Sequence, residues 1–223
     1  MTGRLENAAT RERAVFLCRE EIARDPSVRR LLHEALAPLD VSVAVTNRRV
    51  RRGFAEQVAE IDAMLADCAV AIGHGYDAWV LMAAAAERAD RDLLVPQLLL
   101  VNPVLGASQH LNGALLGYRA PRGRRVRAAF GLEADEDGLP ELVERTTYVF
   151  GDNDPHSSLR DWRYLRGLGC RVHGIRGWHE RNRASVEAQL FEVLADYARD
   201  LVAVSDATPG DDEPDIRRVA GGI

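Results

Sequence analysis

The sequence places a histidine and two aspartates in short loops that directly follow apolar runs. Asp152 and Asp154 come after the run that ends at Gly151, and His179 comes after the run that ends at Ile175. A carboxylate can hold a histidine ring in one tautomer while that ring takes up or releases a proton near neutral pH. These residues therefore indicate general acid–base chemistry. The sequence leaves open which of the two aspartates takes part.

A third junction has the pattern of a sharp turn between a strand and a helix. The apolar run Cys68–Gly73 continues through the sequence GHGYD into a helical pattern that begins at Ala78. The middle residue of this turn is Gly75, which reaches positive φ without steric strain but has no side chain that could attack a substrate. Covalent catalysis from position 75 is therefore excluded.

Six short apolar runs are predicted as strands, and amphipathic helical patterns separate them. Nearly continuous apolarity is typical of strands in a parallel sheet that helices cover on both faces. The predicted strands are Ala14–Cys18, Val41–Thr46, Cys68–Gly73, Gln97–Asn102, Thr147–Gly151 and Arg171–Ile175. The predicted helices are Ser27–Ala37, Gly53–Asp67, Asp77–Arg91, Ser158–Gly167 and Arg183–Val204. Ligands of such sheets bind beyond the carboxyl ends of the strands, where the polar loops lie.

The order of the three junctions is similar to that of the α/β-hydrolases, especially the small single-domain bacterial esterases. The turn GHGYD stands where these enzymes have Gly-x-Ser-x-Gly, with Gly75 in place of the serine and Asp77 in place of the last glycine. Asp154 resembles the family's acid more closely than Asp152 does, and His179 resembles its histidine. The resemblance implies a three-layer α/β sandwich around a mainly parallel sheet of about six strands.

The resemblance also implies roles for residues around the turn. One oxyanion donor is the backbone N–H of Tyr76, and the second comes from the loop after the first strand, where this chain has Cys18 and Arg19. A cysteine at a strand end is more often a small buried hydrophobe than a nucleophile. His74 stands at a packing position. The expected ligand contacts are His156, Asn102 and Trp178.

Composition excludes several function classes. All 29 basic residues are arginine, so a Schiff-base lysine and a P-loop lysine are impossible. The net charge of -5 disfavours broad nucleic-acid binding, and no apolar run approaches the roughly 20 residues of a membrane helix. Three cysteines without paired spacing and a polar N-terminus predict a cytoplasmic protein. We expect a small-molecule substrate or ligand and neither metal nor cofactor, and a homodimer is left open.

The sequence predicts one α/β-hydrolase-like domain over residues 13–204. Residues 1–12 form an N-terminal arm, and residues 205–223 are too polar and too rich in Gly and Pro to pack, which predicts a disordered acidic tail. Residues 107–145 contain no clear strand and include an arginine cluster between Arg119 and Arg127. A connection of this length indicates a lid-like insertion or a solvated surface segment.

Two functions are compatible with these features. The first is an enzyme that uses His179 and Asp154 for acid–base chemistry without a covalent step, as a lyase, cyclase, isomerase or water-mediated hydrolase of a small organic or acyl substrate. The second is a catalytically inactive pseudohydrolase that binds or scaffolds, with the arginine cluster facing an acidic partner or anionic ligand.

Overall fold

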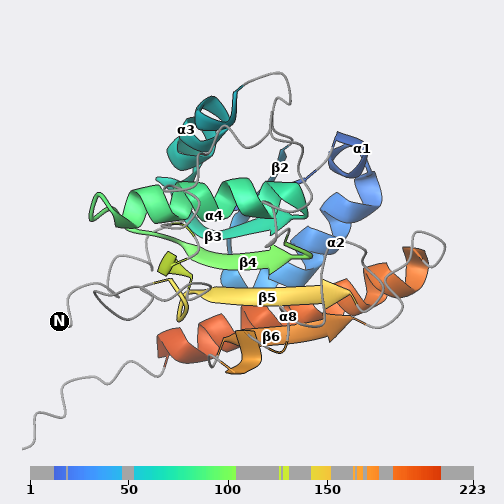
Figure 1. Ribbon diagram of the computed structural model, residues 1–223. Helices are drawn as coiled ribbons and strands as arrows, with labels where there is room; N and C mark the ends of the chain where they lie inside the picture. The colour runs from blue at the N-terminus through green and yellow to red at the C-terminus, as the bar shows by residue number, and fades with distance from the viewer. Residues whose placement is uncertain are drawn as a thin grey trace, which may run out of the picture.

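A parallel sheet and its helices make up most of the chain that the structure describes (Figure 1). The computed structural model describes residues 13–18, 20–46, 53–103, 126, 128–130, 142–151, 163, 165–167, 170–175 and 183–206. The strands are β1 (Arg13–Leu17), β2 (Ser42–Thr46), β3 (Cys68–His74), β4 (Gln97–Val101), β5 (Thr146–Gly151) and β6 (Arg171–Ile175). The helices whose ends lie in these ranges are α1 (Glu20–Ala23), α2 (Pro26–Leu36), the 3-10 helix η1 (Ala37–Leu39), α3 (Phe54–Leu65), α4 (Tyr76–Ala89) and α8 (Arg183–Asp206).

All neighbouring strands of the sheet are parallel, and their order is β2-β1-β3-β4-β5-β6. The chain moves from β1 to one edge at β2, and from β3 it moves to the other edge at β6, so the direction of winding reverses between β1 and β3. In open parallel sheets, such a reversal creates a crevice beyond the carboxyl ends of the two strands. A ligand is therefore expected at the ends of β1 and β3.

Helices cover both faces of the sheet and give the molecule three layers (Figure 1). Leu98, Leu100 and Tyr148 belong to the core that α3 and α4 cover. Leu99 and Val101 belong to the opposite core, under α2 and α8. Successive strand residues point to opposite faces of the sheet. Because helices cover both faces, both sets of alternating residues in a central strand must be apolar. This burial explains why the strands are continuous apolar runs in the sequence.

The predicted α/β architecture is confirmed, including the parallel sheet of six strands within the described ranges. Most element ends differ from prediction by one or two residues. At the carboxyl edge of the sheet, for example, β1 ends at Leu17, β3 extends to His74 and β4 ends at Val101. The predicted helix Ser158–Gly167 lies largely outside the described residues, of which Arg163 and residues 165–167 are helical. No helix in the described part of the chain is both long and apolar enough to cross a membrane.

Candidate functional site

A sharp turn at Gly75 connects β3 to α4 at the carboxyl edge of the sheet. Its backbone has φ 60° and ψ -121°, and residues with a side chain rarely adopt such a positive φ because Cβ then contacts the backbone. The Gly75 N–H donates a hydrogen bond of 2.8 Å to the carbonyl oxygen of Val101. This bond ties the turn to the end of β4, and the predicted strand–turn–helix junction is therefore present.

The two glycines of the turn have different surroundings. A Cβ atom on Gly73 would lie 2.7 Å from Cα of Ala78 and 3.0 Å from its nitrogen. Gly73 therefore allows the first turn of α4 to approach β3 at backbone distance. At Gly75, no atom of the described chain lies within 4 Å of the place a Cβ would take. Within the part of the chain that the structure describes, position 75 therefore has room for a side chain.

Tyr76 and His74 flank Gly75 on the two elements that the turn joins. Tyr76 begins α4, and its ring packs edge-on against Phe54 at the start of α3, with ring centroids 6.4 Å apart. The backbone N–H of Tyr76 belongs to the first turn of α4, whose N–H groups have no acceptor within their own helix. His74 is the last residue of β3 and is half-buried beside Val101.

The end of β1 brings Cys18 close to Asp77 in the first turn of α4. The side chains of Cys18 and Asp77 are buried, with exposed fractions of 0% and 2%. Burial, and secondly the negative charge of Asp77, raise the pKa of the Cys18 thiol to about 12. Cys18 is therefore a neutral thiol at physiological pH. This favours a role as a small buried apolar side chain over a role as a nucleophile. Asp77 lies where the helix dipole stabilises a negative charge.

Asn102 joins the ends of β4 and β5. It is 1% exposed and has a positive φ of 45°. Its backbone N–H donates to the carbonyl oxygen of Val149 at 2.7 Å, and its side-chain Oδ1 accepts from the N–H of Gly151, also at 2.7 Å. Asn102 was predicted as the last residue of a strand and as a ligand contact, whereas this clamp was not predicted. The residue type alone could have indicated the unusual backbone angle, since asparagine tolerates positive φ better than most residues do.

The sheet brings several predicted site residues to one edge. Within the described chain, the ends of β1, β3 and β4 carry Cys18, His74, Gly75, Tyr76 and Asn102. The remaining predicted site residues lie outside the described residues: Arg19, Asp152, Asp154, His156, Trp178 and His179. Among the side chains that are described, no group of three or more His, Cys, Asp and Glu is arranged to hold a metal ion.

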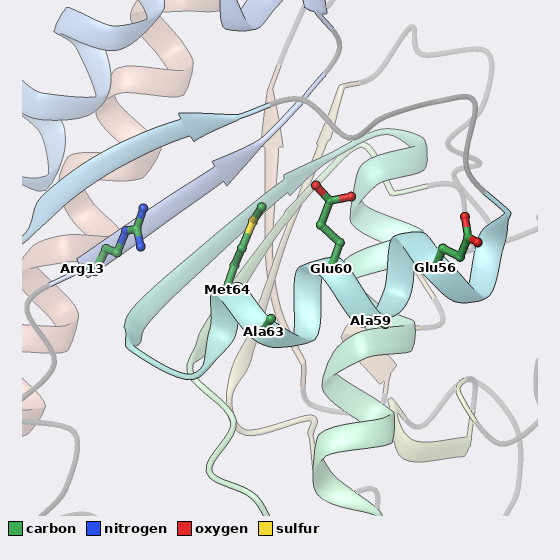
Figure 2. Close-up of a pocket in the computed structure, with 6 residues that line it drawn as sticks. All are labelled: Arg13, Glu56, Ala59, Glu60, Ala63 and Met64. Atoms are coloured by element: carbon green, nitrogen blue, oxygen red, sulfur yellow. The ribbon is translucent and has the colours of Figure 1, made fainter.

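A shallow groove along α3 has a volume of about 830 Å³ and lies apart from this edge (Figure 2). Figure 2 shows Glu60 and Met64 on α3 beside the groove, with Arg13 of β1 on its other side. Its lining residues are Arg13, Glu56, Ala59, Glu60, Ala63 and Met64. None of them is a predicted site residue.

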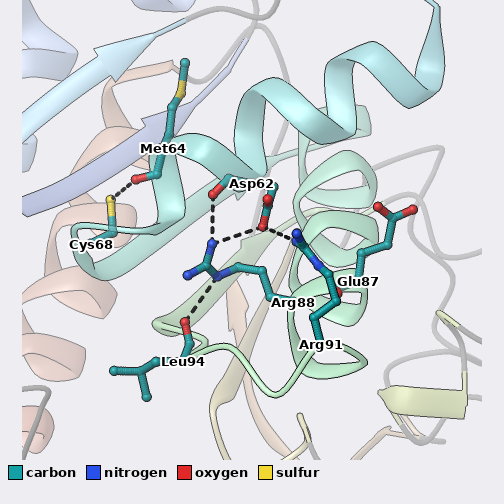
Figure 3. A network of polar contacts seen from close by, with 7 residues as sticks. All are labelled: Asp62, Met64, Cys68, Glu87, Arg88, Arg91 and Leu94. Carbon is teal, nitrogen blue, oxygen red and sulfur yellow. Dashed lines mark hydrogen bonds and ion pairs between the residues drawn. The ribbon is translucent and has the colours of Figure 1, made fainter.

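A buried arginine fixes the far end of α4 (Figure 3). Arg88 is 6% exposed and donates to the carboxylate and to the backbone carbonyl oxygen of Asp62, each at 3.0 Å. It also donates to the carbonyl oxygen of Leu94 at 3.2 Å, and Arg91 forms a second ion pair with the Asp62 carboxylate at 2.8 Å. These contacts anchor α4 to α3 and to the chain that leads into β4. They hold in place the helix whose first turn forms the site.

Comparisons with known proteins place this geometry in a familiar architecture. No protein-family model matches the sequence, and no curated protein is similar to it by sequence. Among solved structures, Est1E from Butyrivibrio proteoclasticus is similar at a TM-score of 0.55 and 14% identity, with 86% of this chain and 88% of that chain covered.

Two further esterase structures are similar over most of their length. The esterase domain of a Rhodothermus marinus protein has a TM-score of 0.53 at 14% identity and covers 86% of this chain and 88% of its own. An esterase from Rhizomucor miehei has a TM-score of 0.56 at 13% identity and covers 88% of this chain and 78% of its own. The parallel six-stranded sheet with helices on both faces is consistent with these likenesses. The chain therefore has the fold of the α/β-hydrolases.

Proposed function

We propose that the chain is an enzyme of the α/β-hydrolase fold that works without a serine nucleophile. His179 and Asp154 carry out acid–base chemistry on a small organic or acyl substrate. The observation that supports this proposal is the turn at Gly75, which has a φ of 60° and no described atom within 4 Å of the place a Cβ would take. A turn of this geometry still presents the backbone N–H groups that stabilise negative charge, and these do not depend on the nucleophile.

The proposed reaction is a proton transfer. His179 takes a proton from a carbon beside a substrate carbonyl, from an alcohol or from a water molecule, and Asp154 stabilises the imidazolium that forms. When the proton leaves carbon, the electron pair of the broken C–H bond forms a carbon–carbon double bond, and the π electrons of the carbonyl move to its oxygen, which becomes negative. The N–H of Tyr76 and the N-terminus of α4 favour that charge. His179 then gives the proton to carbon in an isomerase, to the departing group in a lyase or a water-mediated hydrolase, or to the alkoxide that ring closure forms in a cyclase.

The His179 pKa tests the pairing without knowledge of the substrate. A carboxylate in contact with the ring stabilises its protonated form, so we expect the pKa of His179 to lie above that of an ordinary histidine. The measurement is an NMR titration of histidine ring resonances, with the His179 signal assigned from the His179→Gln variant. In Asp154→Asn, the pKa should return to about the ordinary value.

Asp152→Asn is the matched control, since it removes a neighbouring carboxylate of the same loop. The His179 pKa should stay at its raised value in this variant. A decrease in Asp152→Asn alone would assign the carboxylate to Asp152 and overturn the role of Asp154. An ordinary pKa in the unsubstituted chain would overturn the proposed pairing altogether.

One observation favours a second function, that of a pseudohydrolase which binds a partner or ligand. The buried carboxylate of Asp77 adds a negative charge beside Cys18, at the end of β1 where the resemblance implies an oxyanion donor. Negative charge at that place opposes the binding of an oxyanion. In this case, the arginine cluster between Arg119 and Arg127 is the interaction surface for an acidic partner, and the titration above returns an ordinary pKa for His179.

A further inference from the structure

The parallel ladder between β4 and β5 departs from regular geometry at its last rung. Val101 pairs with Val149 in the register of the two strands, and the N–H of Asn102 continues the ladder with its bond to Val149. In a regular parallel ladder, the next bond would join the N–H of Gly151 to the backbone carbonyl of Asn102. Instead, the N–H of Gly151 donates to the side-chain Oδ1 of Asn102 at 2.7 Å.

The backbone angle of Asn102 explains this exchange. With a φ of 45°, the chain leaves the strand direction at Asn102 and its carbonyl turns out of the ladder. The side-chain amide takes over the acceptor position, so β5 remains hydrogen-bonded as far as Gly151 while β4 has already ended. Few residue types supply both features: glycine tolerates the angle but has no acceptor, and asparagine has both.

The orientation of the amide follows from the hydrogen bond. The N–H of Gly151 needs an acceptor, and the opposite orientation would set the Asn102 NH2 group against it. In the described structure, Nδ2 of Asn102 is buried and has no hydrogen-bond partner. A buried donor of this kind lowers stability.

We propose that Asn102 is a positioning residue that fixes the start of the acid loop. Gly151, which it holds, is followed directly by Asp152, Asn153 and Asp154. The hydrogen bond sets where the chain enters this segment and thereby where Asp154 meets His179. This inference rests on the proposed function, because it assumes that Asp154 pairs with His179. It adds a residue whose side chain acts through the backbone of β5.

Two substitutions at position 102 separate the acceptor from the backbone angle. Asn102→Gly keeps the positive φ without strain and removes the acceptor, so we expect the His179 pKa to fall by roughly half a unit to one unit. Asn102→Asp keeps an oxygen acceptor for the Gly151 N–H and tolerates the same angle, and here the pKa should stay at or above its value in the unsubstituted chain. Both values come from the histidine NMR titration.

Thr146→Val is the matched control at the other end of β5. The Thr146 hydroxyl is buried and donates to the carbonyl oxygen of Leu142 at 2.6 Å, so its loss removes a comparable hydrogen bond far from the acid loop. We expect the His179 pKa to be unchanged in this variant. An equal decrease in Thr146→Val and Asn102→Gly would show a general loss of stability and would overturn the positioning role.

The outcomes separate this inference from the proposed function. If Asp154→Asn lowers the His179 pKa and Asn102→Gly does not, the pairing stands and the role of Asn102 is refuted. If Asp154→Asn has no effect, the proposed function itself fails. Hydrogen exchange of the Gly151 amide in the unsubstituted chain needs no variant: exchange as slow as that of Val149 supports the clamp, and exchange as fast as that of an exposed loop contradicts it.

Discussion

Gly73 and Gly75 show how two identical residues can satisfy different demands two positions apart. Gly73 is required by space, because any side chain there would meet the backbone of Ala78 at less than van der Waals distance. At position 75, no described atom would clash with a side chain, and only the φ of 60° favours glycine. The turn therefore depends on Gly73 for packing. Position 75 is structurally free to carry a side chain at the cost of backbone strain.

The buried thiol of Cys18 makes the unfolding free energy of the protein decrease with pH in the alkaline range. The folded-state pKa of its thiol is raised from 9.0 to about 12 by burial and by Asp77. The folded chain therefore holds a proton that the unfolded chain releases above pH 9. The stabilisation is complete below pH 9 and is lost as the pH rises toward 12.

We predict that Cys18→Ala weakens this dependence. Between pH 8 and pH 10, the unfolding free energy of the unsubstituted chain should fall by about 1 kcal/mol more than that of Cys18→Ala. Urea denaturation at the two pH values measures both quantities, and tyrosine ionisation cancels because it is common to the two proteins. Equal slopes would show that the thiol ionises as readily in the folded chain as in the unfolded one.

At the scale of elements, the pair of helices α3 and α4 depends on Arg88. Removal of its guanidinium leaves the carbonyl oxygens of Asp62 and Leu94 without this donor. It also removes one of the two arginines that pair with the Asp62 carboxylate. We predict that Arg88→Met lowers the unfolding free energy by about 2 to 4 kcal/mol, as measured by denaturant titration. The apolar stem of methionine keeps most of the packing of the arginine stem.

Arg30→Met provides the contrast for this prediction. Arg30 forms an ion pair with Glu34 at 4.0 Å, and both side chains are largely exposed, at 75% and 61%. Such a pair contributes little, so the variant should change stability by less than about 0.5 kcal/mol. If the two arginine variants were equally destabilised, burial of the Arg88 network would not explain its effect.

Elements that are long enough to show a periodic pattern of apolar residues can be predicted from the sequence, whereas very short elements cannot. All six strands and the helices α2, α3, α4 and α8 follow from apolar runs and amphipathic stripes. The helix α1 and the 3-10 helix η1 span four and three residues, which is about one turn, and no period can be recognised over that length. Element ends are also set by hydrogen bonds that residue type does not determine.

The same limit applies to the candidate site. Gly73 and Gly75 are recognisable because a sharp turn after a strand restricts residue type. The proximity of Asp77 to Cys18 depends on two elements that meet only in the folded sheet, and the clamp of Asn102 on Gly151 joins residues 49 positions apart. Contacts of this range leave no pattern in a single sequence, whereas the loop order that points to Asp154 and His179 does.

At the scale of the whole molecule, the reversal of winding determines where chemistry can occur. β1 and β3 are neighbours in the sheet, yet the chain goes from β1 to α2 on one face and from β3 to α4 on the other. In an open parallel sheet, this reversal is where a ligand crevice is expected. The first turn of α4 faces it with backbone N–H groups and the buried carboxylate of Asp77. A site at this place follows from topology, and the loops after β5 and β6 add the remaining groups in the proposed function.

We predict that Gly75→Ser restores a reactive nucleophile, because the proposed function leaves the other parts of a hydrolase site assembled. No described atom obstructs a side chain at position 75, while the φ of 60° makes the substitution lower the unfolding free energy by about 1 to 3 kcal/mol. A serine that His179 activates should react with a fluorophosphonate, and mass spectrometry would detect the added mass on residue 75. Labelling should be lost in Gly75→Ser combined with His179→Ala, which keeps the serine and removes the base. A folded Gly75→Ser chain that remains unlabelled would mean that the loops after β5 and β6 do not complete a site over the turn, and it would favour the pseudohydrolase.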